Sequence, residues 1–119
     1  MIDANQGWRN AKEALYNLRK FEAFNLSFIE EPVRADLLDD LVQIKKADIL
    51  PVAGGENVYT RYEFKESFTK GALDIVQPDI TKTGGLSEAK VICQMADAWG
   101  IPYAPHMFGT CLLYTSRCV

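Results

Sequence analysis

The stretch FIEEPVRADLLDDLVQIKKADILPVAGGEN, residues 28–57, decides the fold class of this chain. It begins with a short apolar segment that stops at two glutamates, and it ends with a second apolar segment that stops at Glu56. Between the two segments, Asp36 is placed to cap a helix. A strand, an amphipathic helix and a second strand in this order are typical of a unit with parallel strands. The apolar face of the predicted helix consists of Leu37, Leu38, Leu41, Val42 and Ile44.

The same alternation continues on both sides of this stretch. Apolar residues at helical spacing predict three more helices, with Phe64, Phe68 and Trp99 in the core. Because near-continuous apolar strands alternate with these helices, the fold class is predicted to be α/β with a buried parallel sheet. The additional helices are expected at about 8–22, from the cap Thr60 to the stop Gly71, and from Gly84–Gly85 to Gly100. The additional strands are expected at 1–2, 73–76 and 101–104.

A polar side chain follows the end of each predicted strand, at intervals of 27, 26, 23 and 27 residues. In a (β/α)₈ barrel the carboxyl ends of all strands point to one face, so these side chains would converge. In an open doubly wound sheet they would spread along an edge, and only those near a switch point would meet. The five residues are Asp3, Glu30, Glu56, Asp79 and His106.

The length allows only part of a barrel. A complete (β/α)₈ barrel needs about 250 residues, whereas this chain has 119 residues and strand material for five strands. We therefore expect residues 1–110 to form a partial (β/α)₈ barrel that belongs to a longer protein. Residues 111–119 break the alternation, and their Cys-Leu-Leu-Tyr-Thr-Ser stretch can be back-translated into the end of a common sequencing adapter. We expect this tail to be non-native.

Composition excludes several function classes. Sixteen acidic against thirteen basic residues give a net charge of -3, with no basic stripe for nucleic acid. No apolar run approaches the roughly 18 residues of a membrane span, and the sequence begins without a signal-peptide pattern, so we expect a cytoplasmic protein without a membrane partner. The odd cysteine count, without a C-x-x-C pair, argues against a disulfide framework or a zinc ribbon: Cys93, Cys111 and Cys118.

The strand-end residues suggest a chemistry. Asp3, Glu30 and Glu56 would supply three carboxylates, and oxygen ligands in this number suit Mg²⁺. A bound cation would also let a substrate carboxylate approach, which three bare acids would repel. Asp79 and His106 could form a hydrogen-bonded dyad in which the carboxylate orients the imidazole as a general base.

Five motifs occur in order along the chain: Asp3-Ala-Asn5-Gln, Ile29-Glu30-Glu31-Pro32, Gly55-Glu56-Asn57, Gln77-Pro78-Asp79 followed by Lys82-Thr-Gly84-Gly85, and Pro105-His106-Met-Phe. Together they resemble the C-terminal barrel of the enolase superfamily, mandelate racemase subgroup. The resemblance implies that the chain covers about strands 3 to 7, that the three acids bind Mg²⁺, and that Asp79 and His106 form the catalytic dyad. It also implies that Asn5 contacts substrate.

In that family Mg²⁺ binds the substrate carboxylate and stabilises the ene-diolate formed when a base removes the α-proton. The muconate-lactonising subgroup has a lysine base where this chain has Asp79. Some sugar-acid dehydratases have histidine where this chain has Asn5, which disfavours that type. The resemblance therefore implies a sugar-acid dehydratase or a lactone cycloisomerase, with a racemase or epimerase as the alternative. We expect the parent enzyme to be a homo-oligomer.

The family's Lys-x-Lys motif, its eighth-strand acid and its capping domain lie outside this chain. We therefore expect the isolated chain to have weak activity or none, and a noncatalytic α/β fragment remains a second hypothesis. Lys82 could contact an anionic substrate, or it could be a solvated lysine at a helix start.

Overall fold

The computed structural model describes residues 1–108, so the tail expected at 111–119 lies outside the described residues. Strands and helices alternate along this part of the chain, as the sequence predicts, and the α/β class is confirmed. The elements are β1 (Ile2–Asp3), α1 (Ala11–Leu18), the 3-10 helix η1 (Glu22–Phe24), β2 (Ile29–Glu30), α2 (Leu38–Lys46), β3 (Val52–Gly54), α3 (Thr60–Lys70), β4 (Ile75–Val76) and α4 (Leu86–Ala98).

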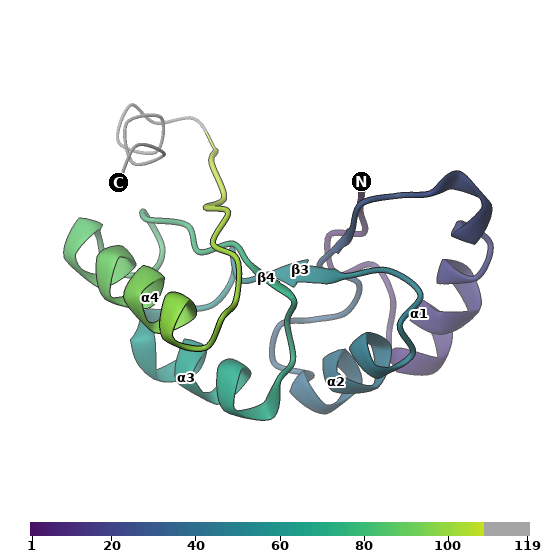
Figure 1. The fold of residues 1–119 in the computed structure, drawn as a ribbon, viewed down its shortest axis with the longest axis horizontal. Helices are drawn as coiled ribbons and strands as arrows, with labels where there is room; N and C mark the ends of the chain where they lie inside the picture. The colour runs from purple at the N-terminus through teal and green to yellow at the C-terminus, as the bar shows by residue number, and fades with distance from the viewer. Residues whose placement is uncertain (109–119) are drawn as a thin grey trace.

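The four strands form one parallel sheet in the order β1-β2-β3-β4. Its register pairs Asp3 with Glu30 and Glu30 with Ala53, so the carboxyl ends of neighbouring strands lie side by side. Figure 1 shows α1 to α4 following one another in an arc along one side of the sheet, and each helix contacts the next. Helices on one side form the wall of a barrel, whereas a doubly wound sheet carries them on both faces.

The fifth predicted strand is reduced to single bridges. Residues 101–104 form no strand, but Tyr103 pairs with Val76 and, further along, His106 pairs with Asp79, both in parallel. Two backbone hydrogen bonds flank the first bridge: Val76 N–H donates to Pro102 O at 2.9 Å, and Ala104 N–H donates to Val76 O at 2.9 Å. This segment therefore lies beside β4 and brings His106 next to Asp79.

Helix α1 is shorter than the predicted 8–22. Asn10 caps it, because its side chain accepts a hydrogen bond from Glu13 N–H at 3.0 Å. Asp40 of α2 accepts a bond from Ala11 N–H at 2.7 Å, which satisfies another free donor of the first turn. After Leu18 the chain tightens into turns that lead to η1. The apolar spacing therefore predicts a longer helix than the one that forms, which begins after the cap Asn10 and ends at Leu18.

The two predicted amino-terminal caps of α2 and α3 are wrong. The Asp36 carboxylate accepts hydrogen bonds from Arg34, and α2 begins only after Leu37, without a side-chain cap. Thr60 is itself the first residue of α3, and Glu63 instead reaches back to accept from Tyr59 N–H at 2.8 Å. The predicted carboxyl-terminal glycines are confirmed: Gly71 ends α3 and Gly100 follows α4, with φ of 68° and 69°.

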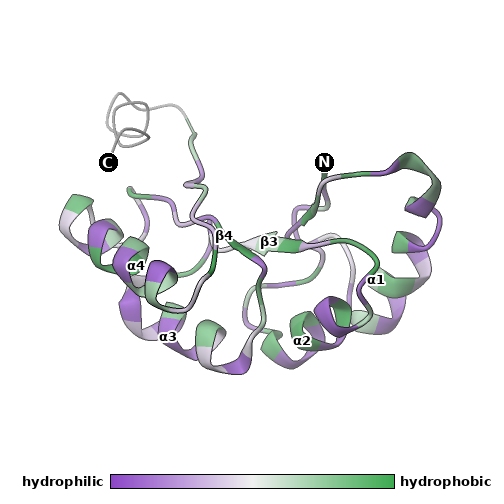
Figure 2. Cartoon of the chain, in the orientation of Figure 1, coloured by the Kyte–Doolittle hydropathy of each residue, from purple (hydrophilic) through white to green (hydrophobic). Residues whose placement is uncertain are grey.

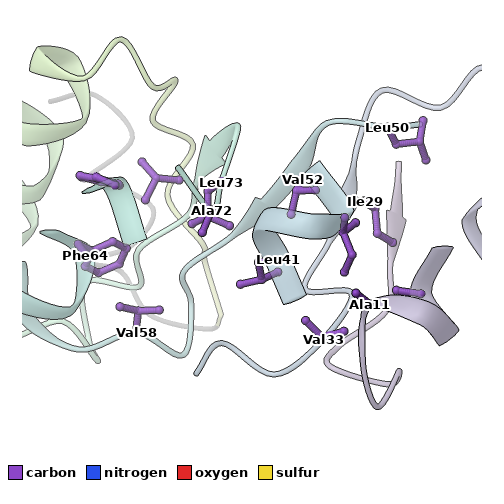
Figure 3. Close-up of a cluster of buried hydrophobic side chains, with 14 of the residues drawn as sticks. Ala11, Ile29, Val33, Leu41, Leu50, Val52, Val58, Phe64, Ala72 and Leu73 are labelled. Atoms are coloured by element: carbon purple, nitrogen blue, oxygen red, sulfur yellow. The ribbon is translucent and has the colours of Figure 1, made fainter. Parts of the chain in front are cut away.

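The core lies between the sheet and the helices. Figure 3 shows part of it, with Ile29 and Val52 of neighbouring strands close to Leu41 of α2. Each helix carries both hydrophobic and hydrophilic residues, as Figure 2 shows. Phe64 and Phe68 are buried as predicted, but Trp99 is 49% exposed, which corrects its placement in the core. It lies just after the end of α4 and packs on Phe68 at 6.0 Å between ring centroids, while about half of its surface stays open to solvent.

Among the helices of residues 1–108, none has both the length and the apolar character that crossing a bilayer requires.

Candidate metal and proton-transfer site

Asp79 and His106 meet directly. His106 Nδ1 lies 2.9 Å from Asp79 Oδ2 across the parallel bridge that joins the two residues. The other carboxylate oxygen accepts from Thr81 N–H at 2.8 Å and from Thr81 Oγ1 at 2.6 Å. Burial acts to raise the pKa of Asp79, but the hydrogen bonds from Thr81 and His106 outweigh it and lower this pKa. Asp79 therefore stays ionised and fixes the ring of His106.

The second ring nitrogen of His106 faces Glu56. Nε2 lies 2.9 Å from Glu56 Oε2. Because a carboxylate only accepts hydrogen bonds, Nε2 can bond Glu56 only as a donor. The ring is thus held between two acids, and Nε2 can take a proton from a substrate only after its own proton has left to solvent and Glu56 no longer covers it.

Asp3 and Glu30 sit at the ends of β1 and β2, in adjacent register positions. Glu30 is only 7% exposed. Burial raises the pKa of its carboxyl, the charges of Asp3 and Glu56 add to the rise, and Gln77 and His106 oppose it. The three acids are therefore close enough for their charges to interact. A cation placed among them would relieve both the repulsion and the cost of burying Glu30.

The donor set fits Mg²⁺ in its chemistry, since Mg²⁺ prefers carboxylate oxygens. Nevertheless, no three His, Cys, Asp or Glu side chains within the described residues converge as ligands of one ion. The Glu56 carboxylate instead contacts His106 and lies 3.6 Å from Lys82 Nζ. A site that uses all three carboxylates would therefore differ from this arrangement, in which Glu56 contacts His106.

A glycine determines where Glu56 can lie. Gly55 has a φ of 126°, and a Cβ atom there would lie 2.9 Å from Phe64 Cε1 and 3.3 Å from Gln77 N. Only glycine allows the backbone after β3 to take this conformation and to approach Phe64 so closely. Gly55 thereby places the following residue, Glu56, opposite His106.

The two residues predicted to contact substrate have different surroundings. Asn5 is exposed just after β1, and its backbone N–H donates to Asp3 Oδ1 at 2.8 Å. Lys82 follows β4, and its Nζ donates to Asn57 Oδ1 at 3.0 Å beside Glu56. Lys82 therefore joins the group around His106, whereas Asn5 borders the carboxylate of Asp3.

The sequence pattern predicts no role for Glu31 or Asn57, but both belong to the site. Glu31 is 4% exposed and accepts hydrogen bonds from Gln6 Nε2 at 3.0 Å and from Asn57 Nδ2 at 3.0 and 3.2 Å. A signal was available, because each is the second of two consecutive polar residues at a strand end, after Glu30 and Glu56.

The family model described as "Enolase C-terminal domain-like" matches residues 1–118. An arabinonate dehydratase of Saccharolobus solfataricus is 42% identical over 105 residues, which are 88% of this chain and 28% of that protein.

Two crystal structures of other proteins closely resemble the fold of this chain. The 3,6-anhydro-D-galactonate cycloisomerase from Zobellia galactanivorans has a TM-score of 0.92 and 38% identity, over 98% of this chain and 33% of that chain. The L-talarate dehydratase from Polaromonas sp. JS666, complexed with Mg and L-glucarate, has a TM-score of 0.84 and 31% identity, over 90% of this chain and 30% of that chain. The predicted partial barrel is thereby confirmed, and the chain spans about a third or less of the length of these relatives.

Proposed function

Since this chain belongs to the family of enolase C-terminal domain-like proteins, we propose that it is part of a longer, magnesium-dependent enzyme that removes the α-proton of a carboxylate substrate. We call this longer protein the parent enzyme. The chain supplies the metal ligands and one general base, and further elements of the parent enzyme complete the barrel.

The observation that carries the proposal is the contact between Asp79 Oδ2 and His106 Nδ1 at 2.9 Å. Asp79 accepts a hydrogen bond from Nδ1–H, so Nε2 is the basic nitrogen once it has released the proton that bonds Glu56. Thr81 holds Asp79 from the other side with two hydrogen bonds. This arrangement fixes the direction in which His106 takes the α-proton, and an oriented general base of this kind contributes about 10²–10⁴ in rate.

Asp3, Glu30 and Glu56 would hold Mg²⁺ at the ends of their strands. When bound, Mg²⁺ stabilises the negative charge that develops on the substrate carboxylate as the α-proton leaves. Without such stabilisation, an imidazole is too weak a base for a proton beside a carboxylate.

Glu56 couples the two parts of the site. Its carboxylate lies 2.9 Å from His106 Nε2, the atom that must accept the proton. A rotation of Glu56 toward Asp3 and Glu30 would uncover Nε2, whose proton would pass to solvent. We therefore infer that the base becomes available only when the three carboxylates act together.

The proposed substrate is a small sugar acid or its lactone. Support comes from the relatives, which are named as an arabinonate dehydratase, an anhydrogalactonate cycloisomerase and a talarate dehydratase. Asn5 and Lys82 would provide polar contacts to hydroxyl or carboxylate groups. Dehydration and lactone cycloisomerisation both begin with the proposed proton transfer, and racemisation remains the alternative.

The experiment is an α-proton exchange assay of the parent enzyme in deuterated water. A panel of aldonates and aldarates is incubated with Mg²⁺, and proton NMR follows both exchange and products. Loss of water identifies a dehydratase, a lactone rearrangement identifies a cycloisomerase, and inversion alone identifies a racemase. Absence of Mg²⁺-dependent exchange on every sugar acid and on mandelate would contradict the proposal and favour a noncatalytic role.

A further inference from the structure

A chain of side-chain hydrogen bonds links the loops that follow all four strands. Gln6 after β1 donates to Glu31 after β2, at 3.0 Å between Nε2 and Oε2. Asn57 after β3 donates from Nδ2 to the same Glu31 carboxylate, at 3.0 and 3.2 Å. Lys82 after β4 donates from Nζ to Asn57 Oδ1 at 3.0 Å. Glu31 is the buried member of this chain, and it accepts hydrogen bonds from the loops after β1 and β3.

The charges of its neighbours leave the Asn57 amide one orientation. Glu31 and Glu56 are carboxylates and only accept hydrogen bonds, so both must face the NH₂ group of Asn57. Asn57 Nδ2 lies 3.1 Å from Glu56 Oε1, in agreement with this requirement. The amide oxygen must then face a donor, and Lys82 provides an ammonium group there. Turning the amide over would set its oxygen against two carboxylates.

We infer that Glu31 is a positioning residue: its buried carboxylate fixes the Asn57 amide and, through it, places the Lys82 ammonium beside Glu56. Lys82 Nζ lies 3.6 Å from Glu56 Oε1, so the positive charge sits next to the carboxylate that contacts His106. If the proposed function holds, this places a cation where an anionic sugar acid would approach. The inference rests on the proposed function only for that last step.

Two features distinguish Glu31 from an ordinary buried polar residue. Its direct side-chain partners are two amides, and within residues 1–108 it forms no ion pair that would offset the cost of its burial. Its backbone has a φ of 39°, in the left-handed region that non-glycine residues rarely adopt. Local constraints of this kind persist where the surrounding structure holds a side chain in one place.

The test is competitive labelling of lysines with trace acetic anhydride on the full 119-residue chain, without metal or substrate, read by mass spectrometry. Lys82 is partly shielded, and its ammonium is engaged by Asn57 and Glu56. In Glu31→Gln, an amide replaces the carboxylate and can no longer accept from Gln6 and Asn57 with two oxygens. We expect Lys82 to label about threefold faster or more, which corresponds to the loss of one modest hydrogen bond.

The controls separate positioning from loss of structure. Lys45 is the internal reference in every sample, because its ammonium pairs with Asp74 at 3.2 Å and general unfolding would release Lys45 and Lys82 together. Glu66→Gln makes the same chemical change at an exposed position on α3 and should leave the ratio of Lys82 to Lys45 unchanged. Glu31→Asp keeps the charge but shortens the side chain, and it should raise the same ratio.

A selective rise at Lys82 in either Glu31 variant supports the positioning role. An unchanged ratio in both variants, or a rise shared by all lysines in both, would overturn it. Because no metal or substrate takes part, failure of this test leaves the α-proton exchange assay unaffected, and failure of that assay leaves this test intact.

Discussion

The two sides of the candidate site differ in how their charges are balanced. We call Asp3 and Glu30, at the ends of β1 and β2, the acidic side. We call Glu56, Asp79, Lys82 and His106, after β3 and β4, the paired side. On the paired side each acid contacts a nitrogen group within 3.6 Å. On the acidic side, burial and like charges raise the pKa of Glu30, and no cationic side chain in the described part of the chain pairs with either acid.

This difference shows what the chain assembles alone. Opposite charges attract, so hydrogen bonds and ion pairs hold the paired side together without any other component. Like charges repel, so the acidic side can form a compact three-carboxylate site only when a cation compensates it. Glu56 belongs to both arrangements, and it lies with the paired side in this structure.

The largest effect is expected when the general base of the paired side is removed. His106→Asn in the parent enzyme removes the only histidine of this segment and with it the proton carrier. We expect α-proton exchange to fall by about 10²–10⁴ or more, measured in deuterated water with the substrate found in the panel. Mg²⁺ affinity should survive, because the three carboxylates remain. Exchange at the parental rate would mean that another base carries this step.

The next effect concerns the backbone that supports the paired side. Gly55→Ala forces alanine to a φ of 126° and places its Cβ 2.9 Å from Phe64 Cε1. Backbone strain and overpacking together should lower the free energy of unfolding by about 3 kcal/mol. Gly71→Ala is the matched control, since it has a φ of 68° but no atom within 4 Å of the added Cβ. Its cost should be about 1 kcal/mol, and equal costs in urea unfolding would show that contact with Phe64 is unimportant.

A third prediction tests whether the acidic side binds Mg²⁺. Mg²⁺ at 100 times its dissociation constant should stabilise the folded chain by about 2.7 kcal/mol, because binding to the folded state alone shifts the equilibrium. Thermal melts with and without Mg²⁺ measure this. Glu30→Gln should abolish most of the shift, whereas Glu66→Gln, at an exposed site, should retain it. An equal Mg²⁺ shift in Glu30→Gln would place the ion elsewhere.

The smallest effect is an opposite dependence on pH. Glu30 has its pKa raised by burial, so its contribution to stability is present below the ordinary value of 4.5 and is lost as pH rises through the raised pKa. Asp79 has its pKa lowered, against the effect of burial, by Thr81 and His106. Its contribution is present above the ordinary value of 3.8 and is lost as pH falls through the lowered pKa.

Urea unfolding with a chelator between pH 3 and 8 tests both signs. Relative to the unchanged chain, Glu30→Gln should become more favourable for stability toward neutral pH, because it removes a buried charge. Asp79→Asn should be destabilising at neutral pH, with a cost that shrinks in acid. Parallel curves for the two variants would remove the distinction between the two sides.

The sequence was sufficient to predict which residues lie at the strand ends. It was not sufficient to predict how all of their side chains pair. Parallel strands repeat at a nearly constant interval, so Asp79 and His106 could be expected on neighbouring strand ends, and their 2.9 Å contact agrees. The contact between Glu56 and His106 could not be predicted, because spacing does not show which charged neighbour a flexible side chain contacts. Trp99 follows helical spacing but lies just past the end of α4 and is about half exposed.

The role of Glu31 was hidden for a related reason. Its partners Gln6 and Asn57 come from two other loops, and no pattern within one loop reveals a bond to another. The cap at Asp36 failed because Arg34, two residues away, competes for the same carboxylate. Local signals predict well where the backbone conformation of one residue decides the outcome. Gly71 is an example, since its φ of 68° ends α3.

The most direct measurement of the coupling between the two sides is ¹⁵N NMR of the His106 ring during a Mg²⁺ titration of the chain. The sequence contains a single histidine, so its ring signals are unambiguous. We predict that Mg²⁺ draws Glu56 away from Nε2, so that the Nε2 signal shifts in a saturable way while Nδ1 keeps its bond to Asp79. Glu56→Gln should abolish that saturable shift. An Nε2 signal that does not move at Mg²⁺ concentrations that raise the melting temperature would contradict the coupling through Glu56.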